Sequence, residues 1–302
     1  MNITIENFKR LVHFLTPVNS PTEFSPYSIF KPRDNKFEEV KAGPFKNEYI
    51  IIDQTYAYSL VIPAYNEEKR IGPFLTELTK GLNRNWEIIV VCDGNDRTAD
   101  IARSHNGRFK VIESKHRLGK GGAILEGFKA SIGDVIGYVD ADGAIAVSEI
   151  LKVFSCISEG CDVAVGSRWL NSSVVVSKQP LIRTVLGRLY HYLTFTFLRL
   201  TIKDTQCGIK AFRRSALLEV IPKVTIRNLS FDTSLLYNCK KSGSEIREVP
   251  IVWSHKDGSR VNSGKAAVVM FLSLIGIWMA HLKNSEVLLK IIISVWRIVE
   301  DE

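Results

Sequence analysis

The stretch "DVIGYVDADGA" (134–144) decides the fold, because an apolar, β-branched run ends there in two carboxylates, Asp140 and Asp142. Similar short apolar runs predict further strands at 58–62, 87–91, 110–113 and 162–166. Helical patterns lie between the runs, at 67–82, 96–105, 120–131 and 147–159. Strands that alternate with helices and are apolar on both faces indicate an α/β fold with a doubly wound, Rossmann-like, mostly parallel sheet.

Polar motifs follow three of these strands directly. They are "PAYNEE" (63–68), "CDGND" (92–96) and "DADG" (140–143). In doubly wound sheets, ligands bind at the carboxyl ends of the strands. We therefore expect the three motifs to meet at one edge of the sheet and to form a binding site there.

The acidic pair predicts a metal site, because two hard carboxylate oxygens in one cleft suit Mg²⁺ or Mn²⁺. Such an ion neutralises a departing nucleoside diphosphate. Asp93 is placed to accept hydrogen bonds from the base or ribose of a nucleotide, or to cap the helix that starts near Asp96. Tyr65 is suited to stack on the base. Glu67 is suited to bind the ribose or base, or only to decorate the first turn of a helix.

The glycine-rich stretch "RLGKGGA" (117–123) lacks the full spacing of a P-loop, which disfavours a P-loop NTPase. Its glycines allow a close approach of the backbone, and Lys120 is long enough to reach an anion. A tight entry into the following helix explains the same glycines equally well.

The composition suits an anionic partner, since the 302 residues carry a net charge of +8. Nucleic acid, anionic lipid and a phosphorylated substrate all meet this condition. The acidic strand ends and the lack of an aromatic RNA-binding signature argue against nucleic acid. Five cysteines without a C-x-x-C pair favour a reducing compartment over a disulfide framework or a zinc site.

Three regions differ in texture. Residues 1–56 combine an amphipathic helical pattern with an irregular arm, residues 57–264 form the α/β domain, and residues 265–302 are strongly apolar. A spanning helix needs about 20 apolar residues. The runs at 266–280 and 287–299 are shorter or interrupted, so we expect helices that lie in the membrane interface. The alternative is a helical hairpin packed on a soluble core.

The stretch "KQPLIRTVLGRLYHYLTFTFLRL" (178–200) predicts a basic amphipathic helix, a pattern typical of membrane surfaces. Its broad apolar face consists of Leu181, Val185, Leu189, Tyr192 and Phe195. We expect it to lie among lipid headgroups and to bring Arg183 and Arg188 to a lipid phosphate. Arg168, in "GSRWL", is another guanidinium suited to a phosphate. A core helix with solvated arginines is the alternative.

Eight motifs occur in an order that resembles the inverting GT-A glycosyltransferases of family two, especially the dolichyl-phosphate glucose and mannose synthases. The motifs are "VIPAYNEE", "CDGND", "GKGGA", "DADGA", "GSR", "DTQCGIKAF", "FDTSLLY" and "DGSR". The likeness covers about residues 57–262. It implies a GT-A fold and a membrane-associated enzyme whose active site faces the cytoplasm.

The resemblance also implies roles for single residues. The nucleotide would be bound by Pro63, Tyr65, Glu67, Asp93 and Lys120, and the diphosphate and metal by Asp140 and Asp142. The catalytic and sugar or acceptor groups would be Asp232, Asp204 and Gln206. Arg260, in "DGSR", would contact the donor phosphates, and His255 is a candidate third metal ligand.

Two motifs depart from the family pattern. The usual "DDGS" is "CDGN" here, and the frequent "FDVE" is "FDTS", so Ser234 stands where an acid is common. This leaves Asp232 as the better candidate for a base. A hydroxyl acceptor needs such a base, whereas a phosphate acceptor is already anionic and needs mainly positioning and charge stabilisation.

The expected function is transfer of mannose or glucose, with inversion, from GDP-mannose or UDP-glucose. The acceptor would be a dolichyl or other polyprenyl phosphate, or its glycosylated form. Two alternatives are a sugar-phosphate nucleotidyltransferase, which also uses strand-end acids and a metal, and a non-enzymatic basic module that binds membranes or nucleic acid. The sequence leaves the oligomeric state open.

Overall fold

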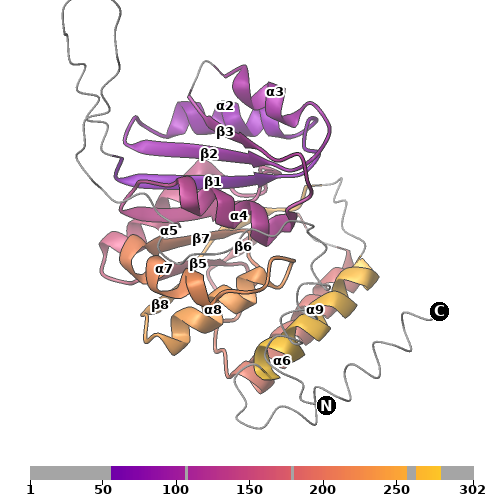
Figure 1. Ribbon diagram of the computed structural model, residues 1–302. Coiled ribbons are helices and arrows are strands. Elements are labelled where there is room, and N and C mark those ends of the chain that lie inside the picture. The colour runs from indigo at the N-terminus through magenta and orange to yellow at the C-terminus, as the bar shows by residue number, and fades with distance from the viewer. Residues whose placement is uncertain (1–55, 106–107, 178–179, 257–262, 280–302) are drawn as a thin grey trace, which may run out of the picture.

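A mixed sheet of seven strands forms the centre of the protein (Figure 1). The computed structural model describes residues 56–105, 108–177, 180–256 and 263–279. The strands are ordered β3-β2-β1-β4-β7-β5-β8. Their bounds are Tyr58–Ala64 (β1), Trp86–Cys92 (β2), Lys110–Glu113 (β3), Val135–Val139 (β4), Val163–Ser167 (β5), Ile209–Arg213 (β7) and Ile246–Pro250 (β8). All neighbours pair in parallel except β7, which is antiparallel to β4 and β5.

Helices cover both faces of this sheet. One face carries α2 (Ile71–Gly81), α3 (Thr98–Arg103) and α5 (Val147–Ser158); the other carries α4 (Gly119–Ala130), α7 (Arg214–Val220) and α8 (Phe231–Lys241). Strand β1 shows why, since Leu60 and Ile62 are buried in one core and Val61 in the other. Successive side chains of a strand point to opposite faces, so a strand that is apolar throughout needs helices on both sides.

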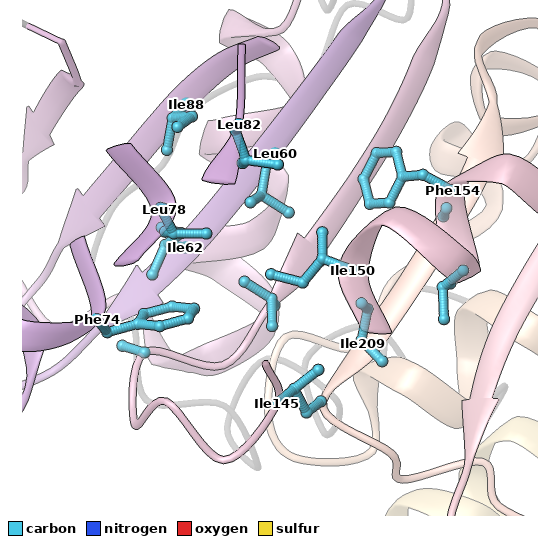
Figure 2. Close-up of a cluster of buried hydrophobic side chains, with 14 of the residues drawn as sticks. Leu60, Ile62, Phe74, Leu78, Leu82, Ile88, Ile145, Ile150, Phe154 and Ile209 are labelled. Atoms are coloured by element: carbon cyan, nitrogen blue, oxygen red, sulfur yellow. The ribbon is translucent and has the colours of Figure 1, made fainter. Parts of the chain in front are cut away.

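Figure 2 shows the first of these cores. Leu60 and Ile62 of β1 meet Phe74 and Leu78 of α2, and all four side chains are at most 2% exposed. Ile150 and Phe154 of α5 extend the cluster. This close packing fixes the positions of the strand ends, where the polar motifs begin.

Four further elements, β6, β9, α6 and α9, lie outside the seven-stranded sheet. A small parallel sheet pairs β6 (Val174–Ser177) with β9 (Val252–Ser254). The helices α6 (Leu181–Leu198) and α9 (Ser263–Met279) run side by side as a pair that stands off from the sheet (Figure 1). A short 3₁₀ turn, η2 (Ile221–Lys223), links α7 to the segment before α8. Among the described residues, no helix is both long and apolar enough to cross a membrane.

The expected α/β fold with a mostly parallel sheet is confirmed, and each predicted strand and helix between 58 and 167 has a counterpart within a few residues. The helix predicted over 178–200 is α6, which begins directly after Pro180. The N-terminal helix and arm, the apolar run at 287–299 and Arg260 lie outside the described residues. The division into three regions therefore stays a prediction.

Candidate active site

The three polar motifs meet at one edge of the sheet, because β1, β2 and β4 are parallel neighbours. Asp93, which follows β2, is buried and accepts hydrogen bonds from the backbone N–H groups of Leu118 and Gly119, both at 2.9 Å. It also forms an ion pair with Arg117. Asp93 thus caps the start of α4, whereas α3 is capped by Asp96, whose Oδ1 accepts from the N–H of Thr98 at 3.0 Å.

Arg117 is a residue of this edge that sequence reasoning missed. Its guanidinium lies 3.5 Å from the centroid of the Tyr65 ring, and its charge faces Asp93. The Tyr65 ring is therefore held by a cation on one side. Arg117 begins the stretch "RLGKGGA", and nothing in its own motif indicates that it contacts Tyr65 and Asp93.

Glu67 follows β1 at the same edge and is held by its own turn. Both of its carboxylate oxygens accept from Arg70 at 2.7 Å, and its N–H donates to Thr98 Oγ1 at 2.8 Å. Pro63 belongs to β1 itself, paired with Val91 of β2. Both residues lie at the predicted nucleotide edge, and their contacts to a base or ribose stay predictions.

Asp140 and Asp142 follow β4, and their surroundings fit a cation. The Lys120 ammonium lies 2.9 Å from Asp140 Oδ1, which shows that this carboxylate already attracts positive charge. Burial, and then the charge of Asp140, raise the pKa of Asp142. Two crowded carboxylates of this kind gain from a divalent ion between them. A Cβ on Gly208 would lie 2.3 Å from Asp140 Oδ2, so glycine is needed for the aspartate to keep this place.

The described residues contain no group of three or more His, Cys, Asp or Glu side chains that would hold a metal. The structure thus does not bring His255 to the two aspartates, although that position was a candidate third ligand. Its ring instead lies 5.8 Å from that of Trp253, between centroids. The remaining ligands of an ion at Asp140 and Asp142 would have to come from a donor diphosphate and water.

Gly121 of "GKGGA" serves helix packing. A Cβ on Gly121 would lie 2.5 Å from the Cβ of Phe231 in α8 and 2.7 Å from the carbonyl oxygen of Arg227. The Gly121 N–H donates to that same oxygen at 2.9 Å. The close approach brings α4 against α8, and with it Lys120 against Asp232.

Asp232, a predicted catalytic carboxylate, is completely buried in the first turn of α8. Its Oδ1 accepts from Lys210 Nζ at 2.8 Å and from the hydroxyl of Tyr138. Its Oδ2 lies 3.5 Å from Lys120 Nζ. Burial raises the pKa of Asp232 to about 6, against the opposing charge of Lys120. Burial, and then the charge of Lys120, lower the pKa of Lys210 to about 7.

Asp204, the other predicted catalytic carboxylate, is the counter-ion of Arg168. The guanidinium donates to it twice, Nε to Oδ2 at 2.7 Å and Nη2 to Oδ1 at 2.8 Å, and the Arg168 N–H donates as well. Burial opposes the charge of Arg168, but Asp204 outweighs it and raises the guanidinium pKa. This forked ion pair fixes Arg168 in one orientation.

A cavity of about 1470 Å³ opens beside this ion pair, between α6 and α9. Its basic wall residues are Arg168, Arg183, Arg188 and Lys203, and its apolar wall includes Leu186, Leu193, Met270 and Phe271. Gln206 lines it too and donates to Thr233 Oγ1 at 3.0 Å. The structure thus gathers the four basic groups around one space, three of which the sequence had singled out.

One short loop connects this cavity to the acidic pair. Asp204 and Gln206 lie in the cavity wall, whereas the carbonyl of Gly208, two residues further, accepts from the N–H of Asp140 at 2.9 Å. The two halves of the candidate site are therefore neighbours through the loop 204–208.

Comparisons with known proteins agree with this arrangement. Residues 59–221 match the family model for glycosyl transferase family 2. The chain is 34% identical over 276 residues to a dolichyl-phosphate beta-glucosyltransferase of Saccharomyces cerevisiae, with 82% of each chain covered. It is 30% identical over 227 residues to a Homo sapiens enzyme of the same name, with 68% of this chain and 70% of the relative covered.

Solved structures are similar in fold. A glucosyl-3-phosphoglycerate synthase from Mycobacterium tuberculosis, in complex with Mn²⁺, UDP and glucosyl-3-phosphoglycerate, matches with a TM-score of 0.59 at 17% identity. The match covers 74% of this chain and 80% of that structure's chain. At this identity the similarity speaks for the fold alone.

Proposed function

Because the chain belongs to glycosyl transferase family 2 and is a glycosyltransferase, we propose that it transfers glucose from UDP-glucose to dolichyl phosphate, with inversion. The names of the relatives support glucose and a dolichyl phosphate acceptor. UDP-glucose is the glucose donor that the resemblance to the dolichyl-phosphate synthases implies. GDP-mannose is the competing donor raised by the sequence motifs.

The observation that carries the proposal is the state of the two predicted catalytic carboxylates. Asp204 is engaged by Arg168 and Asp232 by Lys210 and Tyr138, and both carboxylates are at most 1% exposed. Both carboxylates are thus already paired with cations, which favours an acceptor that needs no general base. A phosphate monoester needs no such base, because its oxygen is already anionic near neutral pH.

The donor side would be formed by the strand ends. Asp140 and Asp142 would hold Mg²⁺ or Mn²⁺, which supplies positive charge for the leaving nucleoside diphosphate. Lys120 adds a second cation on the same side, since its ammonium is 2.9 Å from Asp140. Tyr65 would stack on the base with the ring face opposite Arg117, and Asp93 fixes the loop that carries Arg117.

The acceptor side would be the cavity between α6 and α9. Arg168, Arg183, Arg188 and Lys203 offer positive charge to a phosphate at one part of its wall, and the apolar side chains offer a path for a prenyl chain. Asp204 accepts from Nε and Nη2 of Arg168 and so fixes the guanidinium plane, and Nη1 would then orient the phosphate oxygen. The acceptor oxygen would then attack the anomeric carbon opposite the diphosphate, which gives inversion.

Membrane attachment belongs to the same proposal. The five apolar residues predicted to share one face of α6 are all exposed: Leu181, Val185, Leu189, Tyr192 and Phe195. Val268 and Phe271 of α9 add to this apolar surface. A lipid surface would cover these side chains and deliver a lipid phosphate to the adjoining cavity. Orientation toward the cytoplasm stays a prediction.

A transfer assay tests the proposal. Purified full-length protein with Mn²⁺, dolichyl phosphate in detergent and UDP-glucose should yield glucosylated lipid and UDP in equal amounts, with little product from GDP-mannose. Asp140→Asn should lower kcat/KM about 100-fold or more. Asp100→Asn is the matched control, because Asp100 is exposed and belongs to α3.

Two results would overturn the proposal. One is transfer of a nucleotide to a sugar phosphate, which the nucleotidyltransferase alternative requires. The other is release of UDP that does not depend on dolichyl phosphate. Preferred use of GDP-mannose would correct the donor while leaving the acceptor in place.

A further inference from the structure

Lys210, the second residue of β7, is a completely buried lysine, and neither the sequence motifs nor the comparisons assign it a role. Buried lysines are rare and costly unless they are paired. Lys210 has two partners: its ammonium donates to Asp232 Oδ1 at 2.8 Å and to the carbonyl of Cys207 at 2.9 Å. Asp232 belongs to α8, and Cys207 belongs to the loop 204–208 that contacts Asp140.

The two carboxylate oxygens of Asp232 contact different groups. Oδ1 is occupied from the interior by Lys210 and by the hydroxyl of Tyr138. Oδ2 is buried without a hydrogen bond and lies 3.5 Å from Lys120 Nζ, on the side of the donor edge. Asp232 therefore links an interior cation to the cation of the site. Its place in the first turn of α8 also favours the negative charge.

The pairing of β4 with β7 places Lys210, Asp232 and Tyr138 next to the acidic pair Asp140 and Asp142. Strand β7 runs antiparallel to β4 with Tyr138 opposite Lys210, and Asp140 follows two residues after Tyr138. A chain of alternating charges results, which runs from Lys210 through Asp232 and Lys120 to Asp140. A well-packed apolar group would fill the same space at less cost, because burying ions is expensive. A functional role for Lys120 and Asp140, at the end of the chain nearest the donor edge, would explain why these charges are buried.

We propose that Lys210 is a positioning residue that, with Tyr138, anchors Asp232 so that Asp232 holds the Lys120 ammonium beside Asp140 for the donor diphosphate. The inference rests on the donor side of the proposed function and is independent of the sugar and the acceptor. Lys210 does not touch substrate; it acts through Asp232 and Lys120.

The test measures binding of Mn²⁺-pyrophosphate by calorimetry, because pyrophosphate carries the diphosphate without base, sugar or lipid. Lys210→Met in the full chain should weaken this binding about tenfold, and Lys120→Met should weaken it at least as much. The double variant should be no weaker than Lys120→Met within about twofold, because Lys210 acts only through Lys120. Lys110→Met is the control, since Lys110 is an exposed strand lysine that donates to the carbonyl of Ala130.

Tyr138→Phe gives a second, milder route if Lys210→Met does not fold. It removes only the hydroxyl that donates to Asp232, and should weaken pyrophosphate binding about threefold in the native background and not at all in Lys120→Met. Thermal unfolding of each variant reports on folding. A lower Tm with unchanged pyrophosphate affinity means a purely structural lysine and overturns the proposal.

The remaining outcomes also test the positioning role of Lys210. Losses that multiply in the double variants, or native protein that does not bind Mn²⁺-pyrophosphate at all, overturn the proposal. If sugar transfer to dolichyl phosphate fails but the coupling between Lys210 and Lys120 is found, the proposed acceptor is wrong and the positioning role stands.

Discussion

The donor edge of the sheet and the helical pair of α6 and α9 differ in which side chains they bury. At the donor edge, charged groups such as Asp93 and Asp232 are buried and paired. In the helical pair, large apolar groups such as Leu181 and Tyr192 are 81% and 64% exposed. Folded proteins usually show the reverse, with charges outside and large apolar side chains inside.

The difference indicates how far each region is complete without a ligand. At the donor edge, ion pairs within the chain already hold the buried charged side chains in place. The helical pair has apolar surface that no described residue covers, which fits a region completed by lipid. Changes at the donor edge should then act on metal and nucleotide, and changes on the helical pair on lipid.

Of the changes that test this comparison, the largest effect is expected at Arg168, which adjoins both regions. Arg168→Lys keeps the charge next to Asp204 but loses the fork that holds both carboxylate oxygens. We expect the KM for dolichyl phosphate to rise about 30-fold while the KM for the donor stays nearly unchanged. Steady-state kinetics with each substrate varied in turn measures both.

Arg213→Lys is the matched control for that experiment. Arg213 pairs with Asp162 at 3.1 Å, at the end of β7 away from the acidic pair, and both side chains are partly exposed. Its replacement should leave both KM values unchanged. An equal rise of donor and acceptor KM in Arg168→Lys would show that the two regions do not divide the substrates.

An intermediate effect is expected on the apolar face of α6. Leu189→Glu places a charge on a side chain that is half exposed in the protein and would be covered by lipid. Binding to phosphatidylcholine vesicles, followed by flotation, should weaken about tenfold. Leu151→Glu on α5, a leucine of similar exposure, should float like the native chain. If both variants float equally well, α6 is not the lipid-facing element.

The smallest effect concerns pH at the acidic pair. Burial and the charge of Asp140 raise the pKa of Asp142, so a proton competes for this carboxylate at higher pH than for an ordinary aspartate. A carboxylate must lose its proton to bind a metal. As the pH falls, Mn²⁺ affinity should therefore begin to drop at a higher pH than an ordinary aspartate ligand would give, as measured by calorimetry over the acidic range. Asp142→Asn should flatten this dependence; a slope unchanged in that variant would assign it to another group.

Much of the donor edge was predictable because it depends on short-range pattern. Apolar runs followed by polar motifs identified β1, β2 and β4, and parallel strands must end at the same edge. The antiparallel strand β7 was not predicted, since its register with Tyr138 depends on a partner more than 70 residues away. Arg117 was missed for the same reason, because its partners Tyr65 and Asp93 lie in other motifs.

The amino-acid pattern alone determined the fold class, the edge that carries the site and the apolar face of α6, because burial periodicity and strand polarity are local properties of a chain. The tertiary structure alone decided which charges neutralise one another. From the sequence, Asp204 and Asp232 have no evident counter-ion. Folding brings Asp204 to Arg168 and Asp232 to Lys210. Ion pairing depends on distance in space and on the exclusion of water, and neither is written in the spacing of residues.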